Sequence, residues 1–220
     1  MSSSSRKPRL ILARHTQPEG GRVWTILGHK DAPLSEDGKR HWRELAGQLE
    51  RVPIDAVYSS DLSRTWWCAD LVASDRGLPA YRLKELREMD CGELDGMTRE
   101  RAASLYPEVF EGLKRDPVNC RIPGGETLQE VSDRVLPVVK GILAGENKCT
   151  LIVAHAVVNR AVICEALRLP LQHAYRIDQA YGGITIIDYG RTHPVLHTVN
   201  APCVPKKFRE EKAEGSGPAG

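Results

Sequence analysis

Short apolar runs alternate with longer amphipathic segments along most of this chain, and this alternation is the feature that most constrains its fold. The first run, Arg9–Ala13, is too short for a helix and is followed by proline and glycine signals, so it predicts a strand. Further strands are expected at 54–58, 81–86, 149–154, 181–189 and 194–199. Strands alternating with helices predict an α/β fold, in which helices cover both faces of a mostly parallel sheet in a three-layer α/β/α sandwich.

Helical periodicity fills most of the intervals between these runs. Ser35 is placed to cap a helix whose apolar residues recur at i, i+3, i+4 and i+7 between Trp42 and Leu49. Further helices are expected at 61–73, 98–106, 128–142 and 157–169. Pro107 should end the helix at 98–106, and the stretch from 107 to 123 is expected to consist mainly of loops.

The composition is that of an ordinary globular protein. With 220 residues, 41% of them hydrophobic, the chain can build one domain with its own core. We expect that domain at 9–203, with a loop-rich cap near 97–123 and flexible polar tails at 1–8 and 204–220. A formal net charge of +2 gives no reason to expect nucleic acid or a membrane as partner, and no stretch resembles a signal peptide or a membrane span. The expected location is cytoplasmic.

Basic side chains follow three of the predicted strands, at the end where each strand stops. Arg14 and His15 follow the first strand, His155 follows a later one, and Arg64 lies in the first turn of the helix after the second. Ligands of open α/β sheets bind at the carboxyl ends of the strands, so these groups would share one site if the strands are parallel neighbours. Each residue alone is more often structural. Together they indicate an anion site.

Five motifs, in this order, resemble those of the histidine phosphatase, or phosphoglycerate-mutase-like, superfamily. They are Leu-Ala-Arg14-His15, Tyr58-Ser-Ser-Asp-Leu-Ser-Arg64-Thr, Leu86-Arg-Glu88-Met-Asp-Cys-Gly92-Glu-Leu-Asp-Gly96, Pro123-Gly-Gly-Glu-Thr127 and Val153-Ala-His155. An Arg-His pair alone would be a weak signal, whereas five ordered motifs over residues 9 to 190 are a strong one. The resemblance implies a phosphoglycerate-mutase-like fold and a phosphoric monoester hydrolase.

The resemblance also implies which residues handle the phosphate. His15 would attack phosphorus and carry the phosphoryl group as a phosphohistidine, with its second ring nitrogen donating to a backbone carbonyl or a similar acceptor. Arg14, Arg64, His155 and Ala156 would hold the phosphate oxygens, with His155 protonated. Because guanidinium groups can stabilise the charge of phosphoryl transfer, this chemistry needs neither a metal nor another cofactor.

Glu88 matches the superfamily position that protonates the leaving oxygen and then activates water. The alternative is a loop glutamate paired with its neighbour Arg87. Gly28 resembles the family loop where the backbone approaches phosphate, although a plain turn would also explain it. Thr16 and Ala156 stand where the family often has glycine, and we expect these replacements to alter specificity rather than abolish catalysis.

The resemblance leaves the reaction and the substrate open. The compact interval at 89–154 favours a phosphatase over phosphoglycerate mutase-type phosphoryl transfer. The segment Asp178-Gln-Ala-Tyr-Gly-Gly looks like that of α-ribazole-5′-phosphate phosphatases, and a sugar phosphate is the other candidate among small-molecule phosphate esters. A non-catalytic phosphate- or phosphoprotein-binding module is the alternative of a different class. The edge after Val199 leaves room for a homodimer.

Overall fold

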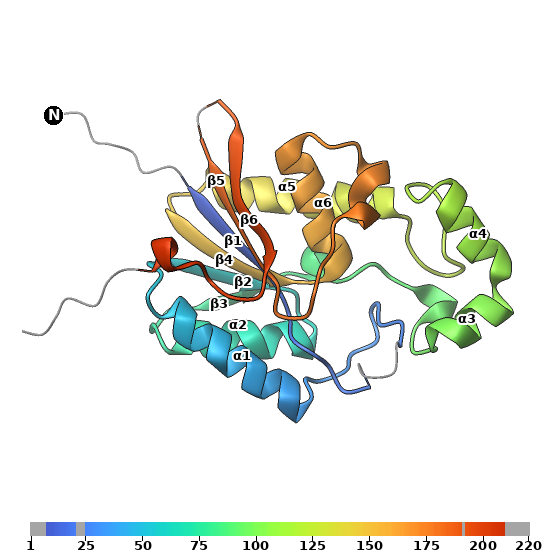
Figure 1. Cartoon of the computed structure of the whole chain (residues 1–220), viewed down its shortest axis with the longest axis horizontal. Coiled ribbons are helices and arrows are strands. Elements are labelled where there is room, and N and C mark those ends of the chain that lie inside the picture. The colour runs from blue at the N-terminus through green and yellow to red at the C-terminus, as the bar shows by residue number, and fades with distance from the viewer. Residues whose placement is uncertain (1–7, 21–24, 191, 210–220) are drawn as a thin grey trace, which may run out of the picture.

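A computed structural model describes residues 8–20, 25–190 and 192–209, which form a six-stranded sheet with helices on both faces (Figure 1). The strands are β1 (Arg9–Arg14), β2 (Ala56–Ser59), β3 (Ala80–Arg82), β4 (Cys149–Ala154), β5 (Ile184–Tyr189) and β6 (Pro194–Ala201), in the order β3-β2-β4-β1-β5-β6. The first four are mutually parallel, β5 runs antiparallel to its neighbour β1, and β6 runs antiparallel to β5. The predicted three-layer sandwich around a mostly parallel sheet is confirmed.

The central strand β1 shows how the sequence builds two cores. Its side chains point alternately to opposite faces, as the two-residue period of a strand requires. Leu10 and Leu12 pack on the face covered by α5 (Leu128–Ala144) and α6 (Ala156–Leu167). Ile11 and Ala13 pack on the other face, under α1 (Glu36–Leu49) and α2 (Ser63–Ser74), as Figure 1 shows. Burial on both faces explains why β1 reads as a continuous apolar run.

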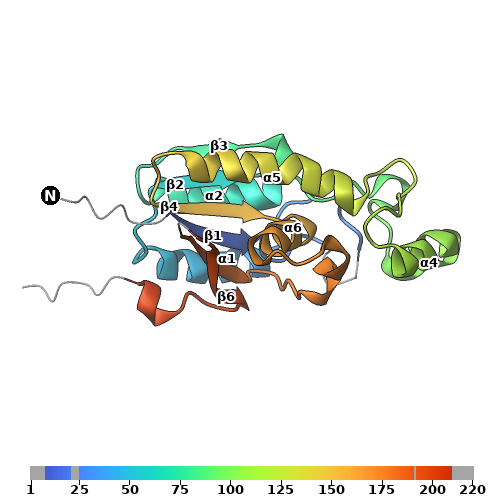
Figure 2. The same cartoon turned by 90° about the horizontal axis from the view of Figure 1, so that it is seen from above.

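A helical cap projects from one end of this sandwich, beyond α5 and α6 (Figure 2). It contains α3 (Arg99–Leu105) and α4 (Pro107–Arg115). The expectation that residues 107–123 form mainly loops is therefore wrong for the first half of that stretch. Pro107 ends α3 but also opens α4, because the first helical position needs no backbone N–H and suits the fixed φ of proline.

Part of the predicted C-terminal tail belongs to the fold. Val204 is fully buried and Phe208, in the short 3-10 helix η4 (Lys206–Phe208), is only 7% exposed. Both pack against the core under α1, and the Arg9 guanidinium lies 4.7 Å from the centre of the Phe208 ring. The prediction of a flexible tail is wrong for residues 204–209, since two apolar side chains in a polar segment suffice to anchor it. Residues 1–7 and 210–220 of the predicted tails lie outside the described residues.

The extent of one strand also differs from the sequence prediction. The strand expected at 81–86 is only three residues long, and the 3-10 helix η1 (Lys84–Leu86) follows it. This short turn redirects the chain toward Glu88. The other 3-10 helices of the described residues are η2 (Gly92–Leu94) and η3 (Leu171–Arg176).

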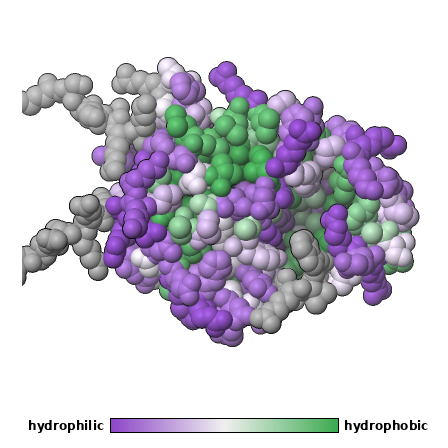
Figure 3. All heavy atoms as spheres, viewed as in Figure 1, coloured by the Kyte–Doolittle hydropathy of each residue, from purple (hydrophilic) through white to green (hydrophobic). Residues whose placement is uncertain are grey.

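The face of the molecule seen in Figure 3 is mainly hydrophilic, with a hydrophobic patch over the region where β5, β6 and α6 lie together. β6 forms one edge of the sheet, and its Val195 and Val199 side chains are about two-fifths exposed. A homodimer through this edge stays a prediction. No helix among the described residues has the length and apolar character needed to span a membrane.

Candidate active site

The ends of β1 and β4 bring two histidines together. These strands are parallel neighbours in which Arg14 pairs with Ala154, so the residues that follow leave the sheet side by side. The His15 and His155 ring centroids are 5.1 Å apart, and the His15 N–H donates to the Ala154 carbonyl. Both histidines are buried. The expectation that the two strands deliver their histidines to one place is confirmed.

His15 is held as a neutral imidazole. Its Nδ1 lies 2.7 Å from the Thr16 carbonyl oxygen, so Nδ1 carries the proton and donates it there, while Nε2 keeps its lone pair. Burial, reinforced by the positive charges of Arg64 and Arg14, holds the pKa of His15 well below its usual value. The backbone acceptor that the sequence could not identify is the residue next in the chain.

His155 differs from its predicted protonation state. Its Nε2 lies 2.8 Å from the Ser60 hydroxyl oxygen, which in turn lies 2.5 Å from the Thr65 hydroxyl oxygen. Burial, with Arg64, His15 and Arg14 nearby, lowers the pKa of His155 well below that of a free histidine. The predicted imidazolium is therefore a neutral ring in the ligand-free protein, because burial and the nearby arginines both disfavour a charge on it.

Two arginines supply the positive charge of the site. Arg14 donates from Nη1 to the Gln179 carbonyl over 2.5 Å, and its guanidinium lies 4.0 Å from the centre of the Tyr181 ring. Arg64, fully buried, donates to the carbonyls of Gly28 and Lys30 over 2.7 and 3.0 Å. Burial is the main cause that lowers the pKa of both guanidinium groups. Carbonyl acceptors position these cations without neutralising them.

Three buried polar atoms of this cluster have no hydrogen-bond partner among the described residues. They are Nε of Arg14, Nε of Arg64 and Nδ1 of His155. Buried polar groups are usually paired, and an unpaired one calls for a physical explanation. An oxyanion placed between the arginines and the histidines would supply acceptors for guanidinium N–H groups that the protein leaves unused.

Glu88 lies at the N-terminus of α6, directly beside His155. Its carboxylate accepts from the backbone N–H groups of Met89, Ala156 and Val157 over 2.9, 3.0 and 3.1 Å. The positive end of the helix dipole favours an anion at this place. The N–H of Ala156 is thus committed to Glu88, and the predicted contact of that residue with phosphate is not what the structure shows.

Arg87 does not pair with Glu88, so the structural alternative for this glutamate is wrong. The Arg87 guanidinium instead makes two hydrogen bonds of 2.6 Å each to the carboxylate of Asp61. The adjacent carbonyl of Glu88 is fixed separately, because Arg134 donates to it over 2.9 Å and His29 Nε2 lies 3.0 Å from it. The Glu88 side chain is therefore set by its own backbone contacts and by α6.

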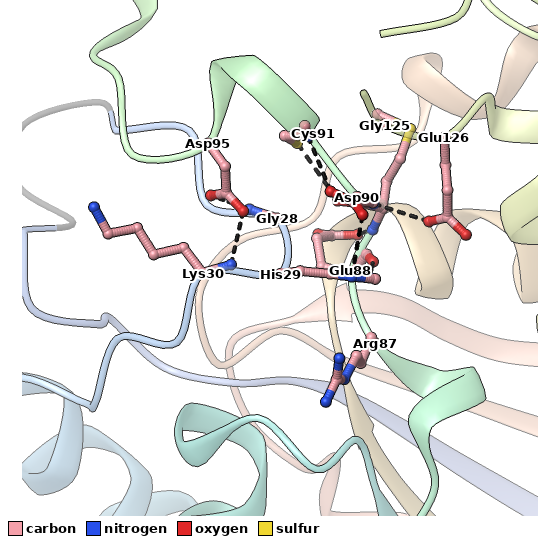
Figure 4. A network of polar contacts seen from close by, with 12 residues as sticks. Gly28, His29, Lys30, Arg87, Glu88, Asp90, Cys91, Asp95, Gly125 and Glu126 are labelled. Atoms are coloured by element: carbon pink, nitrogen blue, oxygen red, sulfur yellow. Dashed lines mark hydrogen bonds and ion pairs between the residues drawn. The ribbon is translucent and has the colours of Figure 1, made fainter. Parts of the chain in front are cut away.

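A loop containing Gly28 packs against the segment that carries Glu88 (Figure 4). The Asp95 carboxylate points at this loop and accepts from the backbone N–H groups of Gly28 and Lys30 over 2.9 and 2.7 Å. A Cβ atom at Gly28 would lie 2.6 Å from both the Met89 oxygen and the Cys91 nitrogen. The glycine is needed for this contact between two backbones, rather than for a contact of its own with phosphate.

The sequence matches the model of the histidine phosphatase superfamily (branch 1) over residues 10–202. The chain belongs to that superfamily. Phosphoserine phosphatase 1 of Hydrogenobacter thermophilus is 30% identical to this histidine phosphatase over 196 residues, which are 89% of this chain and 93% of the relative. A probable phosphoglycerate mutase, GpmB, of Salmonella choleraesuis is 30% identical over 186 residues, 82% of this chain and 85% of that protein.

Solved structures of similar proteins have the same fold as this chain. The crystal structure of the α-ribazole phosphatase from Shigella flexneri superposes on this histidine phosphatase with a TM-score of 0.82 at 26% identity, covering 90% of this chain and 98% of that one. The mostly parallel sheet and its flanking helices are thus those of the phosphoglycerate-mutase-like fold. Relatives named for different activities share this fold, so the fold does not identify the substrate.

Thr16 stands where the family often has glycine, but its side chain adds no group to the phosphate site of this histidine phosphatase. The Thr16 hydroxyl donates to the Gly38 carbonyl over 2.7 Å, and the side chain is fully buried. It therefore ties the loop after β1 to α1, and the expected effect on specificity has no support from this geometry. Ala156 has a negative φ, so the residue does not need to be glycine there.

Sequence reasoning missed three residues that position the site of this histidine phosphatase. Ser60 contacts His155 and lies within a quoted motif, so the motif held the signal although the hydroxyl was not singled out. Gln179 accepts from Arg14 through its backbone carbonyl, which no side-chain pattern reveals. Arg134 reaches the carbonyls of Arg87 and Glu88 from α5, 47 and 46 residues away in sequence. Only the fold shows such contacts.

Proposed function

We propose that this histidine phosphatase hydrolyses a small-molecule phosphomonoester through a phosphohistidine on His15. The observation that carries the proposal is a neutral, buried His15 flanked by Arg14 and Arg64, each with an unpaired Nε. A nucleophilic nitrogen and two cations are what phosphoryl transfer requires, because most of its catalysis is positioning and charge stabilisation.

In the first half-reaction, the lone pair of His15 Nε2 forms a bond to phosphorus and the bond between phosphorus and the leaving oxygen breaks. Glu88, an anion in the ligand-free protein, must carry a proton when the substrate is bound; it gives that proton to the leaving oxygen, and an alcohol departs. In the second half-reaction, the Glu88 carboxylate takes a proton from water, the water oxygen attacks phosphorus, and the bond to His15 breaks. Inorganic phosphate is released, and both residues return to their starting states.

His155 would take part as a hydrogen-bonding partner of the phosphoryl oxygens. The bound dianion would oppose the effects of burial and of the two arginines, and so would favour a proton on the ring. His155 would then be neutral in the free protein and protonated, as the sequence analysis expects, when the phosphate group is bound.

The compact interval at 89–154 favours hydrolysis over return of the phosphoryl group to the substrate, because a less enclosed site leaves water free to accept that group. The chain retains both His15 and Glu88, which argues against a module that only binds phosphate. Likeness to the solved α-ribazole phosphatase, at 26% identity, supports α-ribazole 5′-phosphate as a candidate substrate beside sugar phosphates.

A panel of phosphomonoesters, including α-ribazole 5′-phosphate, O-phosphoserine and 3-phosphoglycerate, tests the proposal by measuring released phosphate and, for the last compound, 2-phosphoglycerate. The expected result is phosphate release from at least one ester, abolished in His15→Ala. Isomerisation of phosphoglycerate in place of release would establish the mutase reaction. Release that persists undiminished in His15→Ala would refute the proposed nucleophile.

A further inference from the structure

A cavity of about 520 Å³ opens beside Glu88, between the helical cap and the body of the fold. Two of its lining residues adjoin Glu88, the proposed proton donor to the leaving oxygen. Met89 follows Glu88 in the chain, and Val157 donates its backbone N–H to the Glu88 carboxylate over 3.1 Å. If Glu88 transfers a proton to the leaving oxygen, the group attached to that oxygen must extend from here into the cavity.

The walls of the cavity are mainly apolar on both sides. Ile26 and Ile122 line it from the body, and Phe110, Leu113 and Pro117 line it from the cap. Ile122 is part of the hydrophobic core, with Phe110 and Leu113 packed against that core, so this lining is a continuation of the protein interior. Such a surface gains most by covering apolar atoms, at roughly 25 cal/mol for each Å² removed from water.

The charged groups among the lining residues are all cations. Arg99 lies 5.4 Å from the centre of the Phe110 ring, Lys114 is paired with Glu111 over 2.6 Å, and Arg176 comes from η3. Among the described residues, no aspartate or glutamate lines the cavity. A ligand carrying an ammonium group would meet like charge. A ligand with many hydroxyl groups would find the cations, Gln172 and Tyr175 as partners, but its remaining hydroxyl groups would lie unpaired against apolar walls.

We propose that the alcohol part of the substrate is a bulky apolar group, aromatic or alicyclic and without a positive charge, and that Phe110 helps to select it. This inference rests on the proposed phosphatase function. It discriminates among the activities for which the relatives are named: the alcohol parts of phosphoserine and phosphoglycerate are small and polar, and would leave most of a cavity of about 520 Å³ without apolar contact.

A pair of esters tests the inference while keeping the chemistry of the leaving oxygen constant. Ethyl phosphate and 2-cyclohexylethyl phosphate both release a primary alcohol, so a difference in kcat/KM reports on the cavity and not on the leaving group. We expect the cyclohexylethyl ester to be preferred by roughly tenfold or more, because even one methylene in an apolar pocket changes kcat/KM by about that factor. O-phosphoserine should be a poorer substrate than the cyclohexylethyl ester.

Two matched variants locate the preference. Phe110→Ala removes one apolar wall and should lower the ratio of the two kcat/KM values toward one. Leu105→Ala removes an exposed side chain of the same cap that does not line the cavity, and it should leave the ratio unchanged. Equal kcat/KM values for the two esters in the wild-type protein, or a ratio that Phe110→Ala does not change, would overturn the inference.

Binding separates this inference from the proposed function. Titration calorimetry of both esters into His15→Ala measures selectivity in the absence of the proposed nucleophile. Tighter binding of the cyclohexylethyl ester, with no phosphate release by the wild-type protein, would refute hydrolysis and keep the apolar selectivity. Phosphate release with equal binding and equal kcat/KM for both esters would refute the selectivity and keep the phosphatase.

Discussion

Replacing Glu88 with glutamine should weaken the fold as well as the chemistry, because the carboxylate serves both. One oxygen accepts from Met89 and Val157, and the other accepts from Ala156. A glutamine side chain keeps only one oxygen, so its NH₂ group must face at least one backbone N–H donor. The arrangement that costs least places NH₂ opposite Ala156 and loses that single hydrogen bond.

The magnitude follows from the kind of hydrogen bond that is lost. A hydrogen bond to a charged group contributes about 1.5–3 kcal/mol, and a negative charge at a helix N-terminus contributes about 0.3–1 kcal/mol more. We therefore expect Glu88→Gln to lower the free energy of unfolding by at least about 2 kcal/mol. For a chain of this size, that corresponds to a fall in Tm of about 4–8 °C.

Thermal and urea unfolding of purified variants measure this effect. Glu85→Gln is the matched control, because Glu85 is exposed, lies three residues earlier on the same segment, and has no side-chain partner among the described residues. Surface changes of this kind usually stay within about 0.5 kcal/mol. A Glu88→Gln variant as stable as Glu85→Gln would refute the role of Glu88 as the anion at the start of α6. A loss of kcat/KM of about a hundredfold or more should accompany the loss of stability, through the missing proton transfer.

Three further outcomes follow from the geometry of the site. The lowered pKa of His15 keeps its ring neutral, so NMR titration should show it unprotonated at pH 5.5. An exposed histidine is about nine-tenths protonated at that pH. A normal titration midpoint for His15 would contradict the argument that burial and two arginines keep the ring neutral. Arg64→Lys should lower kcat/KM by about a hundredfold, since the compact lysine ammonium lacks the planar fork that holds two carbonyls with Nη1 and Nη2 and leaves Nε free for phosphate. Near-wild-type activity would remove Arg64 from the phosphate site. Exhaustive chelation should leave kcat/KM unchanged, because the arginines stabilise the negative charge of the transferring phosphoryl group. In the described part of the chain, no group of three or more His, Cys, Asp or Glu is placed to hold a metal. Activity that is lost on chelation and restored only by added metal would refute this expectation.

The sequence predicted the parts of the site that follow from strand ends. Arg14, His15 and His155 each follow an apolar run directly, and the topology of a parallel sheet then brings them to one edge. A two-residue period and a short apolar run are local properties, so they can be read without knowing the fold. The alternation of strands and helices that defines the sandwich can be predicted from the sequence for the same reason.

The features that the sequence could not predict depend on contacts between distant segments. The neutral state of His155 follows from burial beside two arginines, and the use of the Ala156 N–H by Glu88 joins residues 68 apart in sequence. The sequence predicts that Pro107 ends one helix, and the structure shows that it also starts the next. Val204 shows a similar limit, because a polar segment can be anchored by a few apolar side chains that find a preformed core.

The phosphohistidine on His15 is the central claim, and trapping it is the most direct test. A substrate that the panel identifies is mixed with the protein, the reaction is quenched in alkali within a single turnover, and the peptides are mapped by mass spectrometry. We predict one phosphoryl group on the peptide containing His15, stable in alkali, lost in acid and absent in His15→Ala. A phosphoryl group on His155 instead, or turnover through the same interval with no covalent intermediate, would contradict the account.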